Sequence, residues 1–135
     1  MNPRDLQLLE IRPKIPSAKV SENMSFDEKF QNQTLRPVTK LQEELLLEVL
    51  RNYISKHKNS FYDLALEKRF LFIETAITKD IKFRNSLKGI IIGQFTLEEY
   101  SNYILNSSAL NKRMMNIVKQ NLQNHIQLLE RQMVY

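Results

Sequence analysis

The chain has 135 residues, and its 20 Lys and Arg against 15 Asp and Glu give a formal net charge of +5. It contains no cysteine and only two glycines, which excludes disulfides, thiolate metal sites, cysteine nucleophiles and glycine-rich phosphate loops. A chain of this length with 42% hydrophobic residues can close one core, so residues 1–135 are predicted to form a single domain.

Residues 1–33 are predicted to form an N-terminal arm with two short helices. Asn2 is a favourable N-cap and Pro3 suits the first helical position, which predicts a helix over residues 3–12. Residues 25–28, Ser-Phe-Asp-Glu, form a capping box that begins the second short helix. Helices this short need a partner surface, so we expect the arm to pack on the rest of the chain.

The bundle core is predicted to span residues 34–135, with Thr34 as the cap of a helix over residues 35–57. A longer helix is expected to begin between residues 63 and 67 and to run to Gly93. Its apolar residues cover more than a third of the helix circumference, so it is expected to be the most buried helix. The pattern leaves open a break near Thr78, where neither proline nor glycine marks one.

Two further helices complete the predicted bundle. A capping box at Thr96 and Glu99 begins a short helix that continues through Leu105. Asn106 and the two serines after it cap a final helix over residues 109–133. No window alternates apolar and polar residues for long enough to predict a strand. The fold class is therefore all-α: a small helical bundle with three main helices, a short helix before the last and small N-terminal helices.

The distribution of charge and hydropathy bears on location and partners. No stretch approaches the length of a membrane span, and Met1–Glu10 carries acidic residues where a signal peptide needs an apolar core, so we expect a cytoplasmic protein without a membrane partner. Residues 1–67 have ten basic and ten acidic residues, whereas residues 68–135 have ten basic and five acidic ones. The basic second half is either a solvated face or a nucleic-acid surface.

Metal and hydrolase motifs are missing from the sequence. Its two histidines, His57 and His125, have no acidic residue or second histidine three or four positions away. No nucleophile elbow of the Gly-x-Ser-x-Gly type is present either. We therefore expect no metal and no cofactor, and the sequence identifies no catalytic residue.

Polar residues on faces that the pattern predicts to be buried form a candidate ligand site. These residues are Asp80, Arg84, Lys88, Asn111, Asn121 and His125. Because buried charge is costly unless it is paired, they either satisfy one another or line a cavity. In a cavity, Arg84 can hold an anion in a bidentate fork, the two asparagines can orient it and His125 can exchange a proton. The alternative is a structural Asp80–Arg84 ion pair, with the other polar residues at the edges of the apolar helix faces.

A second set of residues is a candidate interface. Gly89 and Gly93 lie four residues apart, a spacing that allows another backbone to approach closely. Together with Tyr100 and Tyr103 they favour a homodimer or another homo-oligomer. The alternative is that Gly93 ends a helix and Gly89 is a tight packing point.

Residues 83–89 (FRNSLKG), 93–100 (GQFTLEEY) and 106–115 (NSSALNKRMM) resemble a family of short helical bacterial proteins commonly labelled glyoxalase. The resemblance extends over nearly the whole chain. The label would imply isomerisation or hydrolysis of glutathione adducts of 2-oxoaldehydes. Known glyoxalases have His and Glu metal ligands on paired βαβββ modules or a His-rich dinuclear motif, and this sequence contains neither.

Taken with the charge and motif analysis, the sequence predicts a protein-interaction or ligand-binding module without catalytic activity. One alternative is nucleic-acid binding through the basic second half. The other is a metabolite-acting enzyme, a glyoxalase-like lyase, as the family label would imply.

Overall fold

Helices make up the regular secondary structure of residues 1–129, the part of the chain that the computed structural model describes. The helices are α1 (Pro3–Ile11), α2 (Phe26–Phe30), the π-helix η1 (Gln31–Leu35), α3 (Arg36–Leu41), α4 (Glu43–Lys56), the 3₁₀ turn η2 (Ser60–Asp63), α5 (Leu66–Lys79), α6 (Ile81–Ile92), α7 (Leu97–Tyr103), α8 (Ser107–Asn124) and the 3₁₀ turn η3 (Ile126–Leu128). The all-α prediction is confirmed.

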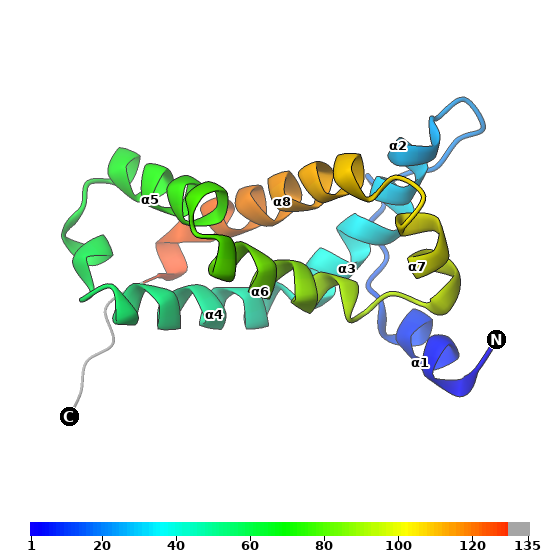
Figure 1. The fold of residues 1–135 in the computed structure, drawn as a ribbon, viewed down its shortest axis with the longest axis horizontal. Helices are drawn as coiled ribbons and strands as arrows, with labels where there is room; N and C mark the ends of the chain where they lie inside the picture. The colour runs from blue at the N-terminus through cyan, green and yellow to red at the C-terminus, as the bar shows by residue number, and fades with distance from the viewer. Residues whose placement is uncertain (130–135) are drawn as a thin grey trace.

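The bundle consists of α4, α5, α6 and α8, and α3 continues it at one end (Figure 1). Helix α8 packs against α3, α4, α5 and α6, and each of them contributes buried apolar side chains to one core. Among these side chains Leu50, Ile73, Leu87 and Met114 are fully buried. Helices α1 and α7 lie together at the α3 end of the bundle, and η2 lies at the opposite end (Figure 1).

The helix predicted to run to Gly93 is two helices, α5 and α6, which are separated at Asp80. Asp80 has an extended backbone with φ −91° and ψ 99°, and its Oδ1 accepts a hydrogen bond from the Phe83 N–H at 3.1 Å. Asp80 is thus the N-cap of α6, so the break that the pattern left open near Thr78 falls at Asp80. Aspartate favours caps because its short side chain competes with helical hydrogen bonding, which is the signal that marks the break.

The helix predicted over residues 35–57 begins earlier and is interrupted. The chain is helical without a break from Phe26 to Leu41, and Thr34 lies inside the π-helix η1, so the prediction that Thr34 is a cap was wrong. Pro37 lacks an N–H and its ring crowds a preceding carbonyl in a regular α-helix, and the wider π turn just before α3 relieves that crowding. Gln42, with φ −91° and ψ 4°, separates α3 from α4.

The last helix is shorter than predicted. Helix α8 begins at Ser107 and ends at Asn124, and the turn η3 follows it, so the prediction of helix over residues 125–129 was wrong. Residues 130–133 of the predicted helix lie outside the described residues. Asn106 precedes α8 as expected, but its amide donates to both carboxylate oxygens of Asp27 and makes no side-chain cap.

The predicted caps Asn2, Ser25 and Thr96 are confirmed. At Ser25 only half of the predicted capping box forms: Ser25 Oγ accepts a hydrogen bond from the Glu28 N–H at 3.2 Å, and the Glu28 side chain does not accept one in return. Asn2 Oδ1 accepts a hydrogen bond from the Asp5 N–H at 2.8 Å. The Thr96 capping box is complete, since Thr96 Oγ1 accepts from the Glu99 N–H at 3.1 Å and Glu99 Oε1 accepts from the Thr96 N–H at 2.8 Å.

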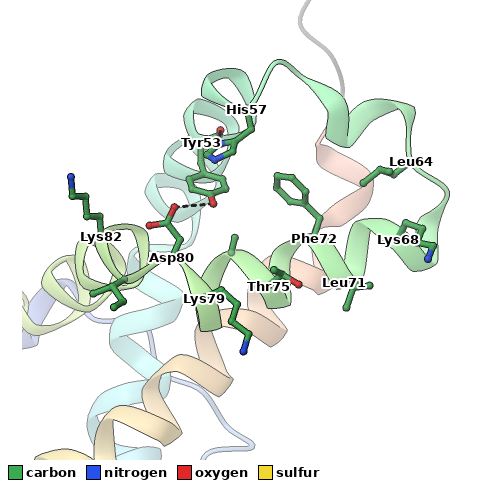
Figure 2. A pocket seen from close by; sticks show the side chains of 12 residues that line it. Tyr53, His57, Leu64, Lys68, Leu71, Phe72, Thr75, Lys79, Asp80 and Lys82 are labelled. Carbon is green, nitrogen blue, oxygen red and sulfur yellow. Dashed lines mark hydrogen bonds between the residues drawn. The ribbon is translucent and has the colours of Figure 1, made fainter.

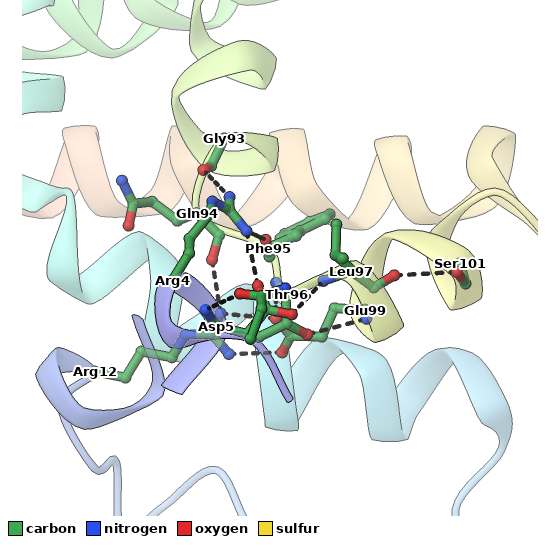
Figure 3. A network of polar contacts seen from close by, with 11 residues as sticks. Arg4, Asp5, Arg12, Gly93, Gln94, Phe95, Thr96, Leu97, Glu99 and Ser101 are labelled. Atoms are coloured by element: carbon green, nitrogen blue, oxygen red, sulfur yellow. Dashed lines mark hydrogen bonds and ion pairs between the residues drawn. The ribbon is translucent and has the colours of Figure 1, made fainter. Parts of the chain in front are cut away.

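A buried polar network fastens the N-terminal arm to the start of α7 (Figure 3). Arg12 donates to the two carboxylate oxygens of Glu99 at 2.6 and 2.7 Å, and the Thr34 hydroxyl donates to the same carboxylate at 2.7 Å. Arg4 donates to the carbonyl oxygens of Gly93 and Phe95, both at 3.0 Å. Glu99 therefore joins three segments that are far apart in the sequence.

The electrostatics of Glu99 follow from this geometry. Burial by itself disfavours the charged carboxylate and raises its pKa, but hydrogen bonds from Arg12, Thr96 and Thr34 and the Arg12 charge outweigh it, so the pKa of Glu99 is lowered. A group whose pKa is lower in the folded state stabilises the fold above its unfolded pKa. That stabilisation is lost as the pH falls through the lowered, folded pKa.

We predict that Glu99→Gln lowers the free energy of unfolding at neutral pH by about 3 kcal/mol, because it leaves the buried Arg12 guanidinium without its counter-charge. Urea unfolding at neutral pH measures the loss. The difference from wild type should shrink as the pH falls through the lowered pKa of Glu99, because protonation then neutralises Glu99 in the wild type as well. Glu98→Gln, at the exposed neighbour on α7, is the control. Equal losses for the two variants would contradict the role of the Arg12–Glu99 pair.

Candidate functional site

The structure divides the six predicted ligand-site residues among three places. Asp80 lies in a groove between α4 and α5. Arg84, Lys88 and Asn111 line a pocket between α6 and α8. Asn121 and His125 contact Glu43 of α4. Helical periodicity placed five of them on the apolar sides of two predicted helices, with Lys88 four residues after Arg84, but the break at Asp80 and the helix crossings separate the six residues.

The α4–α5 groove, an open depression of about 820 Å³, has an aromatic floor. The Tyr53 ring stacks on His57 with centroids 4.1 Å apart, and the Phe72 ring meets Tyr53 edge-on at 6.0 Å (Figure 2). Apolar side chains flank these rings at the surface, where Leu71 is 52% and Ile81 61% exposed. The groove thus presents apolar surface that the bundle itself does not cover.

Positive charge surrounds the aromatic floor. Lys68, Lys79 and Lys82 line the groove and lie at its periphery, around Tyr53 and Phe72 (Figure 2). All three lysines are exposed, and none of the ion pairs formed within residues 1–129 involves them. The margin of the groove therefore carries positive charge that residues 1–129 do not neutralise.

Tyr53 and Asp80 connect the groove floor to the helix break. The Tyr53 hydroxyl donates to Asp80 Oδ2 at 3.0 Å. Burial, followed by the hydrogen bond and charge of Asp80, raises the pKa of Tyr53 to about 12. The Phe83 N–H and the Tyr53 hydroxyl lower the pKa of Asp80. At neutral pH the Tyr53 hydroxyl is protonated and donates the hydrogen bond, and the Asp80 carboxylate is charged and accepts it. This bond therefore fixes the two side chains in the groove and does not transfer a proton.

His57 completes the floor and was not among the predicted site residues. Its Nδ1 lies 2.8 Å from the Tyr53 carbonyl oxygen, so Nδ1 carries the proton that is donated to that oxygen. The signal that identifies the pair is the spacing of four residues, which places Tyr53 and His57 on the same side of α4.

The Arg84 pocket, lined by α6 and α8 and the last turn of α5, has a volume of about 380 Å³. Arg84 Nη1 donates to the Thr78 carbonyl oxygen at 3.2 Å, and within residues 1–129 no Asp80–Arg84 ion pair forms. The alternative of a structural ion pair between these residues was therefore wrong, because Asp80 turns to Tyr53 and the Phe83 N–H. Lys112 joins Arg84 and Lys88 in the pocket.

The third place is the Glu43 cluster, in which Glu43 joins α4 to α8. Asn121 Nδ2 and His125 Nε2 lie 3.0 and 3.1 Å from Glu43 Oε1, and Lys40 Nζ lies 3.1 Å from Oε2. Burial raises the pKa of Glu43, but hydrogen bonds from Asn121 and Lys40 and the charges of His125 and Lys40 outweigh it and lower the pKa. Asn121 and His125 thus hold two helices together instead of facing Arg84.

The four predicted interface residues occupy different environments. Gly89 is exposed, and a Cβ built there meets no atom within 4 Å, whereas a Cβ at Gly93 would lie 3.0 Å from the Gly89 carbonyl oxygen. Tyr100 is 49% exposed. Tyr103 is only 7% exposed, and its hydroxyl donates to Asn111 Oδ1 at 2.5 Å. Tyr103 is therefore a core residue that supports the Arg84 pocket.

Residues 1–129 contain neither a cluster of metal-binding side chains nor a helix that could span a membrane. Their His, Asp and Glu side chains form no group of three that could hold a metal ion. None of the helices in this part of the chain combines the length and the hydropathy of a membrane span.

Comparison of the chain with family models, with curated proteins and with solved structures yields no match.

We predict that Tyr53→Phe leaves the absorbance change of phenolate formation between about pH 9 and pH 11 unchanged, because a pKa of about 12 keeps Tyr53 protonated there. Ultraviolet titration of both proteins measures this. The wild type has five tyrosines, so loss of about a fifth of the signal would contradict the assignment.

The raised pKa also means that Tyr53 stabilises the fold below its unfolded pKa of about 10 and that this contribution is lost as the pH rises towards 12.

Proposed function

We propose that this chain is a protein-interaction module without catalytic activity, and that it binds an acidic, amphipathic helical segment of a partner protein in the α4–α5 groove. The observation that carries the proposal is the combination of exposed apolar surface with a margin of three lysines that pair with no acidic group among the described residues.

The shape of the groove favours a helix as the occupant. Its α5 side is formed by residues 68, 71, 72, 75 and 79, which recur at helical spacing and so run along the length of α5. A groove of this kind accepts the apolar face of a second helix through side chains three and four residues apart. Covering Leu71 and Ile81 would remove apolar surface from water, at about 25 cal/mol per Å².

The charge of the groove favours an acidic partner. Lys68, Lys79 and Lys82 surround it, and its carboxylate, Asp80, is already bound to Tyr53 and to the Phe83 N–H. Acidic residues on the flanks of the incoming helix would meet these lysines, which sets the orientation of the helix and speeds its association. Tyr53 stays protonated and Asp80 stays charged at neutral pH, so these two groups do not exchange a proton.

Two model peptides of about 16 residues, long enough to form a helix, test the proposal. Both have the same leucine face, and their flanks carry either glutamate or lysine. We predict that fluorescence anisotropy at low salt shows the glutamate peptide binding roughly tenfold or more tightly than the lysine peptide, and that added salt weakens its binding. Equal binding of the two peptides, or none of the glutamate peptide, would overturn the proposal.

Charge reversal within the groove is the matched test. In Lys68→Glu/Lys82→Glu both new acids lie in the first turn of a helix, where the helix dipole favours them, so the fold is retained. This variant should bind the glutamate peptide roughly tenfold more weakly or worse. The control, Lys14→Glu/Lys19→Glu, has the same net charge and places it at exposed residues outside the groove. An equal loss in the control would mean that net charge, and not the groove, attracts the peptide.

Self-association is a second proposal, and it rests on α7. Leu97, Tyr100 and Ile104 recur along one side of this helix and its C-cap and are 63%, 49% and 57% exposed. A second copy docked on this face would cover them. We expect sedimentation equilibrium to give a dimer for the wild type and a monomer for Tyr100→Lys. A monomeric wild type at micromolar concentration would contradict this proposal.

A further inference from the structure

The Arg84 pocket is separate from the α4–α5 groove. It shares no lining residue with the groove, although both lie beside the break between α5 and α6. Arg84 and Lys88 lie on the same side of α6, one helical turn apart, and Lys112 faces them from α8. Three cationic side chains from two helices therefore converge on one cavity.

The part of the chain that the structure describes does not neutralise these cations. No Asp or Glu side chain lines the pocket, and within residues 1–129 no ion pair includes Arg84, Lys88 or Lys112. Like charges around a cavity repel one another, and the repulsion is stronger where the surroundings exclude water, as at the half-buried Arg84 and Lys88. An anion in the cavity would remove this repulsion.

The pocket also presents oriented hydrogen-bond donors. Asn111 Oδ1 accepts the hydrogen bond from the Tyr103 hydroxyl, which fixes the amide and leaves its NH₂ group to donate elsewhere. Arg84 uses Nη1 on the Thr78 carbonyl oxygen and keeps its other N–H groups for a second partner. Ile77 and Met115 add apolar surface beside these donors. The arrangement fits an anion that is attached to a small organic body.

We propose that the Arg84 pocket binds the phosphate group of a small phosphomonoester. Arg84 donates to two phosphate oxygens, and Lys88 and Lys112 supply the remaining positive charge. The Asn111 amide donates to a third oxygen, while Ile77 and Met115 contact the body of the ligand. Three cations suit a phosphate dianion better than a single carboxylate, and about 380 Å³ accommodates a small metabolite.

Isothermal titration calorimetry with O-phosphoserine tests the proposal, with serine as the matched ligand that lacks phosphate. We expect O-phosphoserine to bind with a dissociation constant below about 1 mM and serine not to bind. Inorganic phosphate is the second probe. If inorganic phosphate binds as tightly as O-phosphoserine, free phosphate is the ligand of the pocket. If inorganic phosphate binds more weakly, the phosphomonoester is the ligand. Both results support the phosphate site.

The variant Arg84→Gln/Lys112→Gln should weaken O-phosphoserine binding roughly tenfold or more. Lys112→Gln alone changes an exposed residue of α8 that makes no ion pair with residues 1–129, so it keeps the fold even if the Arg84 substitution disturbs the α5–α6 break. It should still weaken binding measurably. The groove variant Lys68→Glu/Lys82→Glu should bind O-phosphoserine like wild type, which separates this inference from the proposed peptide site.

Several outcomes would overturn the inference. One is the absence of binding by O-phosphoserine and inorganic phosphate at several millimolar. Another is an equal loss in the groove variant and in the pocket variant. A third is that a short single-stranded oligonucleotide binds more tightly than either phosphate probe and is weakened by both variants, because that result would assign the cations to an extended nucleic-acid surface.

Discussion

Asp80 ends one helix and begins the next, and both candidate sites depend on this break. Its carboxylate caps α6 through the Phe83 N–H and accepts the Tyr53 hydroxyl from α4. Had α5 continued straight into α6, Arg84 would have stayed in line with Ile73 and Ile77, as helical periodicity predicts. The break turns Arg84 and Lys88 towards α8 and leaves Tyr53 and Phe72 at the floor of the groove.

The two signs of charge have different roles in this molecule. Glu43 and Glu99 are largely buried and serve as junctions, each accepting hydrogen bonds from several segments of the chain. The cations of the groove and of the Arg84 pocket, by contrast, have no anionic partner among the described residues. The excess positive charge of the second half is therefore concentrated at surfaces that can receive an anionic group.

Local sequence signals predicted the starts of α1, α2 and α7, because a cap depends only on residues within one turn. Asn2 and Thr96 are examples, and the all-α class followed from the spacing of apolar residues. The same reasoning failed at Thr34, where a cap-forming residue lies inside a helix and donates to Glu99, 65 positions away in the sequence. Threonine can serve as an N-cap or as a buried hydroxyl donor, and only its long-range partner distinguishes the two roles.

The sequence by itself determined the helical class, the positions of the strongest caps, the excess of positive charge and the absence of cysteine chemistry, because each depends on composition or on neighbours along the chain. The tertiary structure alone decided which polar residues meet. It brought Arg84, Lys88 and Asn111 together in one pocket. It also placed Asn121 and His125 against Glu43 and made the Tyr53 hydroxyl donate to Asp80. Helical periodicity gives the face of a side chain on its own helix, whereas the crossing of helices decides which faces touch.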